Sequence, residues 1–534
     1  MTAQGVLTTD AQPERDSGAK IPDLVVFSVA FLWLVAYALY TGDGWEDFFI
    51  SIRHSVNLVE GNGLTYQPGQ RIQGFSSPLN VFVGAAAVAV TRGMPIDVTL
   101  WAWRMPSLAA FSIGLVFLTN ALGGLRLSSR GLSVLIPAAL YLLESKSVAF
   151  SSNGMETGFL LFFLAGALWV MAAGVGRHPW RMGVCWAGLL LTRPDSIVAI
   201  VLMAVSCLLW TAEGRRSESR GLAGAFGLAA LVYLPWVLWA WSYYGSPVPL
   251  TILAKQPLTP WLLRRFLMLP ANLPATWADL FLPPYAGSGG WEGFRPVALL
   301  LGAIGALSFL WTRGTLLCRR ASLIAFGATC FLTVIPRAMP WYLPGAFLFT
   351  LPALGSVLGR LQNELDARRL GAGRLVLLLS LAPLLFSGWL LIDYAQLARS
   401  SMRVLEDGNR RVLGTWLARN AQPGDRVFLE CPGFIGYYSG LTMLDYPGIV
   451  SPEVVQARRR AGDNPAAAAA ALSPEWLVLR PVELEYLEAA NPGWLINGYR
   501  LVQTFDASPA FRALEPLHPE ALFGATFLVF RRGA

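Results

Sequence analysis

LVVFSVAFLWLVAYALY, residues 24–40, is an uninterrupted apolar run without a single charged side chain. A helix needs about 17–25 apolar residues to cross a hydrocarbon core of about 30 Å, so this run is long enough to do so. It follows a polar tail and lacks the small-residue cleavage site of a signal peptide. We therefore expect a retained first membrane helix, preceded by a cytoplasmic tail at residues 1–22.

The whole composition is that of a multi-pass membrane protein. Of the 534 residues, 54% are hydrophobic and only 14% are charged, whereas soluble proteins carry about 25% charged residues. The net charge is +8, but the basic residues are spread over short loops, which indicates membrane topology. We therefore expect no nucleic-acid partner. The five cysteines show neither a disulfide framework nor metal-ligand spacing.

Further apolar segments predict about 11 membrane helices in a transmembrane domain over residues 23–395. After the first, these segments are 100–122, 131–144, 156–173, 183–194, 195–211, 221–242, 294–311, 321–336, 341–358 and 374–393. The segment 79–91 is too short to span comfortably, so we interpret it as re-entrant or interfacial. The arginine-rich loops then all lie in the cytoplasm. The extracytoplasmic parts are residues 41–99 (the first external loop), 145–156, 193–195, 243–293, 337–340 and everything after 394.

The composition changes near residue 396 and predicts a small extracytoplasmic α/β domain over residues 396–534. Apolar runs shorten to strand length and alternate with helical stretches. The predicted strands are 426–430, 442–446, 475–480, 499–505 and 525–532, and the predicted helices include 403–420 and 452–460. The alanine run at 466–472 predicts a surface helix.

The segment WEDFFISIR (45–53) places two adjacent carboxylates, Glu46 and Asp47, directly after the first span. Apolar residues recur there at helical spacing, which predicts an amphipathic helix lying in the membrane interface and ending near Gly61. Two interpretations of the acids are open. They complement the dipole of the helix, or one of them is a base beside arginines that hold an anionic lipid headgroup.

The stretch EDFFISIRHSVNLVEGNGLTYQPGQRIQGFSSPL (46–79) resembles the first external loop of bacterial polytopic glycosyltransferases. These have the C-type (GT-C) fold, use polyprenyl-phosphate sugars, and include the mycobacterial cell-wall arabinofuranosyltransferases. Other stretches resemble motifs of the same family: NGMETG (153–158), LTRPDS (191–196), YYGSPVPLTILAK (243–255), PWYLP (340–344) and PGFIGYYSGLTMLDYPGIVSPE (432–453). One departure is Glu46, which stands where the family has aspartate, so either acid of the pair is a candidate base.

The resemblance implies an inverting sugar transfer and assigns a set of site residues. Glu46 or Asp47 is the expected base. The expected ligands of the donor phosphate are Arg53, Lys255, Arg193 and Tyr244, and the expected substrate-binding residues are Glu156, His54, Asp195, Trp341, Tyr342 and Arg71. Bland alternatives stay open: a mutual ion pair for Arg193 and Asp195, and interfacial anchoring for Lys255 and the aromatic residues.

The expected protein is therefore a glycosyltransferase of the bacterial inner (plasma) membrane whose site and C-terminal domain are extracytoplasmic. Its expected partners are a polyprenyl-phosphate sugar (arabinofuranose is one candidate), a glycan or protein acceptor, and membrane lipids. A divalent cation, Mg²⁺ or Mn²⁺, held by the acid pair and a phosphate is compatible with the sequence, which has no dedicated metal site. The rival hypotheses are a protein O-mannosyltransferase-like enzyme and a transporter or flippase of lipid-linked saccharides. A transporter would bury ionisable groups deep within several helices.

Overall fold

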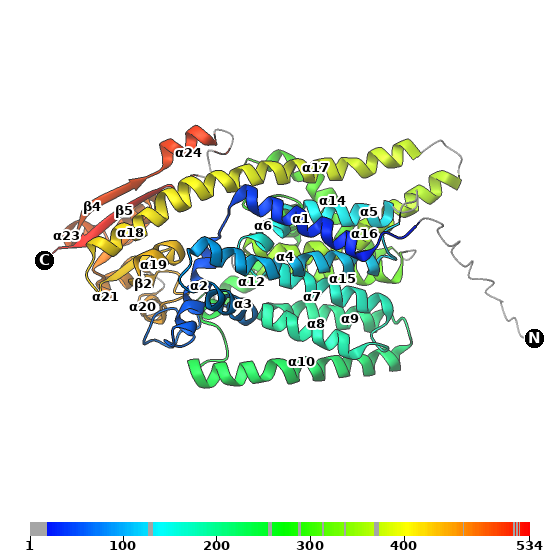
Figure 1. The fold of residues 1–534 in the computed structure, drawn as a ribbon, viewed down its shortest axis with the longest axis horizontal. Helices are drawn as coiled ribbons and strands as arrows, with labels where there is room; N and C mark the ends of the chain where they lie inside the picture. Colours follow the sequence, from blue (N-terminus) through cyan, green and yellow to red (C-terminus); the bar gives the residue numbers. More distant parts are fainter. Residues whose placement is uncertain are drawn as a thin grey trace, which may run out of the picture.

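The computed structural model shows a long helical bundle with a small sheet-containing domain at one end (Figure 1). It describes residues 19–126, 132–254, 259–286, 290–311, 314–335, 338–367, 373–462, 464–515, 518, 522 and 524–533. The first helix, α1 (Asp23–Thr41), matches the apolar run at 24–40 to within a residue.

Each predicted span overlaps a helix of the bundle. After α1, these helices are α4 (Ile96–Ala121), α5 (Leu132–Leu143), α7 (Thr157–Ala173), α8 (Pro179–Thr192), α9 (Ile197–Leu209), α10 (Arg215–Tyr244), α14 (Arg295–Leu307), α15 (Leu316–Val334), α16 (Leu343–Ala367) and α17 (Gly373–Ser401). Within the described residues, seven helices are long and apolar enough to cross a membrane, or eight if one bent pair counts as a span. The protein is thus a multi-pass membrane protein. The number of 11 spans stays a prediction, since helices such as α9, with 13 residues, are short for a span.

The bent pair is α5 and α6 (Ser145–Ser152), which meet at 52°. We predicted an external connection at 145–156, but all eight residues of α6 are buried. Glu144 caps the start of the helix: its carboxylate accepts hydrogen bonds from the backbone N–H groups of Lys146 and Ser147. The Nζ atom of the buried Lys146 lies 2.5 Å from the same carboxylate, so the two charges compensate each other within the protein.

The first external loop contains α2 (Glu46–Val59) and α3 (Pro78–Val90). The helix predicted from residue 45 onward is confirmed, but its apolar stripe does not lie on lipid. Phe48, Phe49 and Ile52 are buried in a cluster with Trp103 of α4, because α3, α4 and the C-terminal domain surround α2. The helix α3 has 13 residues, and its interpretation as re-entrant or interfacial stays a prediction.

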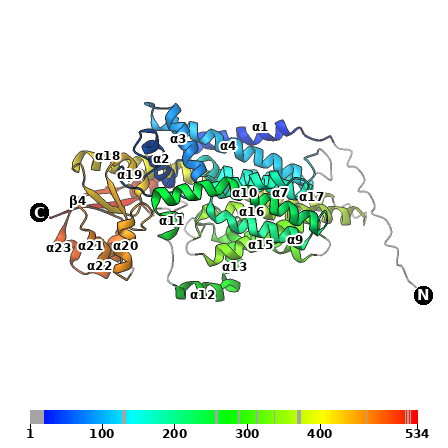
Figure 2. The same ribbon diagram turned by 90° about the horizontal axis from the view of Figure 1, so that it is seen from below.

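Shorter elements occupy the loops between the long helices. They are η2 (Pro194–Ser196), α11 (Leu250–Leu253), α12 (Thr259–Leu267), α13 (Leu269–Asp279), η3 (Glu292–Phe294), η4 (Ser308–Leu310) and η5 (Pro340–Tyr342). Figure 2 shows α12 set apart from the bundle, below α13. The breaks at η2 and η5 matter for function because they place polar side chains between the long helices.

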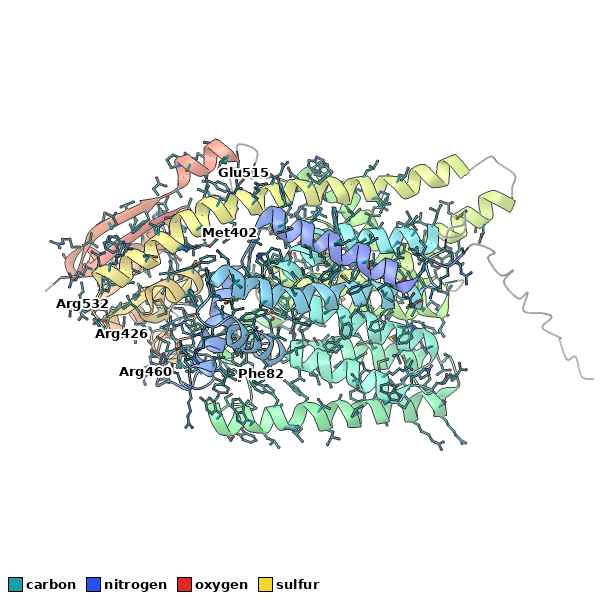
Figure 3. The ribbon with its side chains drawn as sticks, in the orientation of Figure 1. Phe82, Met402, Arg426, Arg460, Glu515 and Arg532 are labelled. Carbon is teal, nitrogen blue, oxygen red and sulfur yellow. The ribbon has the colours of Figure 1, made fainter. Side chains whose placement is uncertain are left out.

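The last long helix continues into the C-terminal domain without a loop. After α17 the chain forms a π-helical segment, η6 (Met402–Arg410), and then α18 (Arg411–Asn420), so the helix predicted at 403–420 is present but starts as a π-helix. Met402 lies between the bundle and the domain (Figure 3). No loop therefore marks the domain boundary predicted at residue 395.

The C-terminal domain contains one five-stranded mixed sheet in the order β2-β1-β3-β5-β4. The strands are β1 (Arg426–Leu429), β2 (Thr442–Asp445), β3 (Trp476–Leu479), β4 (Tyr499–Asp506) and β5 (Thr526–Arg532), which matches the predicted strands closely. The three strands β2, β1 and β3 are parallel, whereas β5 is antiparallel to both β3 and β4. The helices are α19 (Pro432–Ser439), α20 (Pro452–Arg460), α21 (Pro465–Leu472), α22 (Pro481–Ala490), α23 (Trp494–Gly498) and α24 (Ser508–Leu514).

Each face of this sheet packs on its own hydrophobic core. One core includes Ile50 of α2 and Tyr66 of the first external loop, so the loop and the domain fold around shared side chains. The other core contains Ala466 and Ala469 of α21. The alanine run forms a helix at the surface of the domain, as predicted, with Ala471 exposed on its outer face. The small side chains of its inner face let α21 pack closely against the sheet.

Candidate functional site

A cavity of about 270 Å³ lies where the first external loop, the bundle and the C-terminal domain meet. Ligand sites in proteins typically measure about 300–1,000 Å³, so this cavity is near the lower end of that range. Six of the residues predicted for the site line it: Asp47, Glu156, Arg193, Asp195, Trp341 and Tyr342. They come from helix ends that face the C-terminal domain (Figure 1), so the sequence motifs converge on one end of the bundle.

Arg193 is the centre of a buried charge network in the cavity wall. It lies at the break between α8 and α9, where Pro194 ends the helix. Its Nη1 atom donates to Glu156 Oε1 over 2.9 Å, and its Nε atom donates to Asp195 Oδ1 over 3.2 Å. Its guanidinium carbon lies 4.0 Å from the ring centre of Tyr342. The ion pair of Arg193 and Asp195, one of the two alternatives for these residues, is therefore present, and both residues line the cavity.

Burial makes this network energetically sensitive. Arg193 is 4% exposed and Glu156 is 6% exposed. A buried charge costs several kcal/mol unless it is paired and hydrogen-bonded. Among the described residues that line the cavity, three carry a carboxylate, Asp47, Glu156 and Asp195, and one, Arg193, carries a positive charge. An anionic phosphate in this cavity would therefore need further positive charge.

Asp47, the second residue of α2, lines the cavity. Aromatic side chains surround this region: the ring of Trp45 lies 6.1 Å from Trp341 and 6.3 Å from Tyr285, between centroids. Burial raises the pKa of the Tyr285 phenol, and the nearby negative charge of Asp47 raises it further. The carboxylate of Asp47 thus lies beside an aromatic wall at the edge of the cavity.

Glu46 does not line the cavity; its carboxylate binds the start of α19. Its Oε1 atom accepts a hydrogen bond from the backbone N–H of Gly433 over 2.6 Å, and Oε2 accepts from Phe434 over 3.2 Å. The two neighbouring acids therefore point to different places. They do not present two carboxylates to one cation, and within the described residues no three His, Cys, Asp or Glu side chains form a possible metal site.

Arg53 was predicted as a phosphate ligand, but the structure places it at the other end of α19. It donates to the carbonyl oxygens of Gly436 over 2.8 Å and Leu441 over 2.9 Å, and it lies over the ring of Tyr66. Gly436 and Leu441 lie more than 380 positions away in the sequence, so no local pattern indicates these two partners.

His54 is fully buried and contacts the cavity only indirectly. Its Nδ1 atom donates to the carbonyl oxygen of Ile50 over 2.8 Å, and its Nε2 atom accepts from the N–H of Gly74 over 3.3 Å. Because Nδ1 donates and Nε2 accepts, the imidazole ring of His54 carries one proton and is neutral. Burial lowers its pKa from 6.5 to about 4. His54 therefore holds the segment at Gly74 and Phe75, which itself lines the cavity.

We expect His54 to make stability depend on pH below 6.5. Between pH 6.5 and 4 the unfolded chain binds a proton at this ring and the folded protein does not, so folding loses up to about 3 kcal/mol as the pH falls. The variant His54→Gln lacks this titration. Thermal unfolding in detergent at several pH values should show the advantage of the wild type over His54→Gln shrinking from pH 7.5 to 4.5. The pKa of Asp445, which burial raises to about 6, affects both proteins equally. A constant difference across this range would contradict the prediction.

Two further predicted residues lie away from the cavity, and a third lies outside the described residues. The hydroxyl of Tyr244, at the end of α10, donates to the carbonyl of Leu64 over 2.7 Å. Arg71 is exposed and lies over the ring of Tyr243. Lys255 is not among the described residues.

Sequence reasoning missed several residues of the cavity wall. Ser51, Ser76 and Ser77 supply hydroxyl groups, Thr251 and Ile252 come from α11, Phe331 comes from α15, Ile335 directly follows α15, and Ile449 comes from the C-terminal domain. The two serines of QGFSSPL and the residues of α11 lie in stretches that resembled the family. Nothing in the sequence around Ile449 indicated that it lines a cavity, because only the fold brings residue 449 to the bundle.

The fold and cavity place the chain in a known structural class. It is similar to the archaeal oligosaccharyltransferase AglB from Archaeoglobus fulgidus, solved with an inhibitory peptide and a dolichol-phosphate, with a TM-score of 0.54 at 12% identity over 91% of this chain and 73% of that chain. It is also similar to ArnT from Cupriavidus metallidurans bound to undecaprenyl phosphate, with a TM-score of 0.50 at 13% identity over 95% of this chain and 97% of that chain. The chain has the GT-C fold of these glycosyltransferases.

Within this class, the sequence relates the chain to arabinofuranosyltransferases, as its motifs predicted. It is 26% identical over 263 residues to a terminal beta-(1->2)-arabinofuranosyltransferase of Mycobacterium tuberculosis, which covers 42% of this chain and 38% of that protein. The chain spans about two fifths of the length of the curated relatives that it matches. Residues 395–528 match a domain of unknown function, DUF8728.

Proposed function

We propose that this protein is an inverting glycosyltransferase that uses a polyprenyl-phosphate sugar. The sugar, for which arabinofuranose is the first candidate, passes to a hydroxyl group of a glycan or protein on the extracytoplasmic side of the bacterial inner membrane. The observation that carries the proposal is the cavity, where the carboxylate of Asp47 and the guanidinium of Arg193 face the same space. The relatives' names support the sugar, and the fold supports the kind of donor.

Asp47 is the proposed base. It takes the proton of the acceptor hydroxyl while the hydroxyl oxygen bonds to the anomeric carbon of the sugar. The bond between that carbon and the lipid phosphate breaks, and its electron pair leaves with the phosphate. Attack opposite the leaving group inverts the anomeric configuration. Glu46 is unsuited to this role, since its carboxylate is bound by two backbone N–H groups. This mechanism uses no metal ion.

The lipid phosphate needs positive charge beyond Arg193, because Glu156 and Asp195 already bind that guanidinium. We propose Lys255 for this role. Thr251 and Ile252 line the cavity, and Lys255 follows three residues after Ile252. The apolar side chains of Ile252, Phe331 and Ile335 are suited to the first isoprene units of the carrier. Trp341 and Tyr342 are suited to stacking on the sugar.

The test of the proposal is an in-vitro transfer assay with purified protein in lipid nanodiscs. Decaprenyl-phospho-arabinofuranose is compared with polyprenyl-phosphate mannose and other polyprenyl-phosphate sugars, with short arabinan, mannan and peptide acceptors. Transfer from an arabinofuranose donor to a glycan supports the proposal. Transfer of mannose to a peptide would instead support the O-mannosyltransferase hypothesis, and movement of the lipid-linked sugar across vesicles without transfer would support a transporter.

We expect Lys255→Ala to weaken donor binding about tenfold or more, because one charged hydrogen bond to phosphate is lost, worth about 1.5–3 kcal/mol. The apparent KM for the donor should rise while the KM for the acceptor stays within twofold. Lys20→Ala is the matched control, since Lys20 pairs with Asp23 at the start of α1 and does not line the cavity. Unchanged donor KM in Lys255→Ala would remove the phosphate role from this residue.

A further inference from the structure

The helix α19 of the C-terminal domain lies along α2 and is bound at both ends by charged side chains of α2. At its start, the carboxylate of Glu46 accepts the N–H groups of Gly433 and Phe434. The first N–H groups of a helix have no partner within the helix, and this end carries the positive pole of the helix dipole. The negative charge of Glu46 therefore stabilises the start of α19.

The opposite charge binds the opposite end. Arg53 donates to the carbonyl oxygens of Gly436 and Leu441, before and after the left-handed Gly440 that ends α19. Glu46 and Arg53 are seven residues apart on α2, which is about 10.5 Å along a helix. The eight residues of α19 span about 12 Å. The spacing of the two charges thus matches the length of the helix that they bind.

The contact between the two helices is close because α19 presents glycines to the first external loop. A Cβ atom on Gly433 would collide with the backbone oxygen of Glu46, and one on Gly436 would collide with the hydroxyl of Tyr66. That hydroxyl also donates to the carbonyl of Pro432 over 2.6 Å. The position of α19 against α2 is therefore defined by backbone atoms as well as by charges.

The helix α2 and the C-terminal domain, which meet in this contact, each contribute a residue to the cavity wall. Asp47 follows Glu46 directly, and on the other side Ile449 reaches the cavity from the loop after β2. This loop is held by Asp445, whose carboxylate accepts hydrogen bonds from the N–H groups of Ile449 and Val450 over 2.5 and 2.9 Å. The contact between α2 and α19 thus joins the helix that carries the proposed base to the domain that carries Ile449.

We propose that Glu46 and Arg53 are positioning residues that hold α19 at its two ends and so align the C-terminal wall of the cavity with Asp47. We assign the wall at Ile449 to the acceptor, because the apolar residues that we assign to the lipid carrier belong to α11 and the end of α15. The C-terminal domain then contributes to acceptor recognition through α19. This inference rests on the proposed function for its catalytic consequence, and on the contacts of α19 for its structural one.

The structural consequence is tested by hydrogen exchange in nanodiscs. Glu46→Gln and Arg53→Met should each raise the exchange rate of amides in 432–439 and 445–451 about tenfold, because each removes one charged interaction with the helix ends. Glu46→Asp should restore most of the protection, since it keeps the charge. Glu485→Gln, at an exposed position of α22, is the control and should leave both segments unchanged. Unchanged exchange in both Glu46→Gln and Arg53→Met would overturn the proposal.

The catalytic consequence is tested with the transfer assay. For a positioning role, Glu46→Gln raises the acceptor KM about tenfold, lowers kcat less than tenfold, and leaves the acidic limb of the pH profile in place. A kcat reduced more than a hundredfold, with that limb lost and α19 still protected, would make Glu46 the base and overturn the proposal. If the wild type transfers no sugar from any donor, the proposed function fails, while the exchange experiment still decides whether Glu46 and Arg53 hold α19.

Discussion

Replacing Asp47 with asparagine should lower kcat for sugar transfer about 10²–10⁴-fold, which is the usual contribution of a general base. The amide keeps the size of the side chain and its place in the cavity wall but cannot take the proton of the acceptor hydroxyl. The KM values for donor and acceptor should change little, because the substituted group acts mainly in the transition state. Initial rates at saturating donor and acceptor measure this effect.

Two controls make the Asp47 result interpretable. The thermal unfolding midpoint of Asp47→Asn should stay close to that of the wild type, so that loss of activity is not loss of fold. Asp97→Asn changes another first-turn acid, at the start of α4, and should keep nearly full activity. A well-folded Asp47→Asn protein that transfers sugar at more than half the wild-type rate would refute the assignment of the base.

Replacing Arg193 with methionine should destabilise the protein by about 3–5 kcal/mol, the usual cost of removing one partner from a buried ion pair. Without the guanidinium, the carboxylates of Glu156 and Asp195 remain close together in the cavity wall with no positive partner from that position. Donor binding should also be lost, because the cavity then carries only negative charge among its described lining residues. Thermal unfolding in detergent and donor binding measure the two effects.

A double-mutant cycle distinguishes charge from packing at this position. Glu156→Gln combined with Arg193→Met should be less destabilised than the sum of the two single changes, since Glu156→Gln removes a carboxylate that Arg193→Met leaves without its partner. Arg71→Met changes an exposed arginine over Tyr243 and should cost less than about 1 kcal/mol. Additive effects in the cycle would show that the side chains of Glu156 and Arg193 have no interaction free energy with each other.

Local pattern was enough to predict most elements of the fold. The strand β3 at Trp476–Leu479 is a short, wholly buried apolar run between a proline-containing turn and a proline-initiated helix, and such a run has few alternatives. The amphipathic period of α2 predicted its start and its apolar face. The sequence did not show what that face would contact: a stripe such as Phe48, Phe49 and Ile52 packs equally well on lipid or on Trp103.

The candidate site was also predictable only in part from local sequence. Glu156, Arg193 and Trp341 were predicted because they lie in stretches that resemble motifs of the family. Glu156 is also a carboxylate at membrane depth, where a charged residue is costly. The roles of Glu46 and Arg53 were not predictable, because their partners in α19 are nearly 400 residues away in the chain. A short acidic motif looks the same whether it binds a substrate or a helix end, and only the tertiary structure distinguishes the two.

The core shared by Ile50, Tyr66 and the sheet has a consequence for exchanging parts between related proteins. A chimaera that takes its C-terminal domain from a relative inherits a sheet face shaped for that relative's own loop. Ile435 and Met443 would then meet foreign side chains where Ile50 and Tyr66 now fit. We expect such chimaeras to fold only when residues 45–80 are taken from the same relative as the domain. These two distant stretches must therefore be exchanged together.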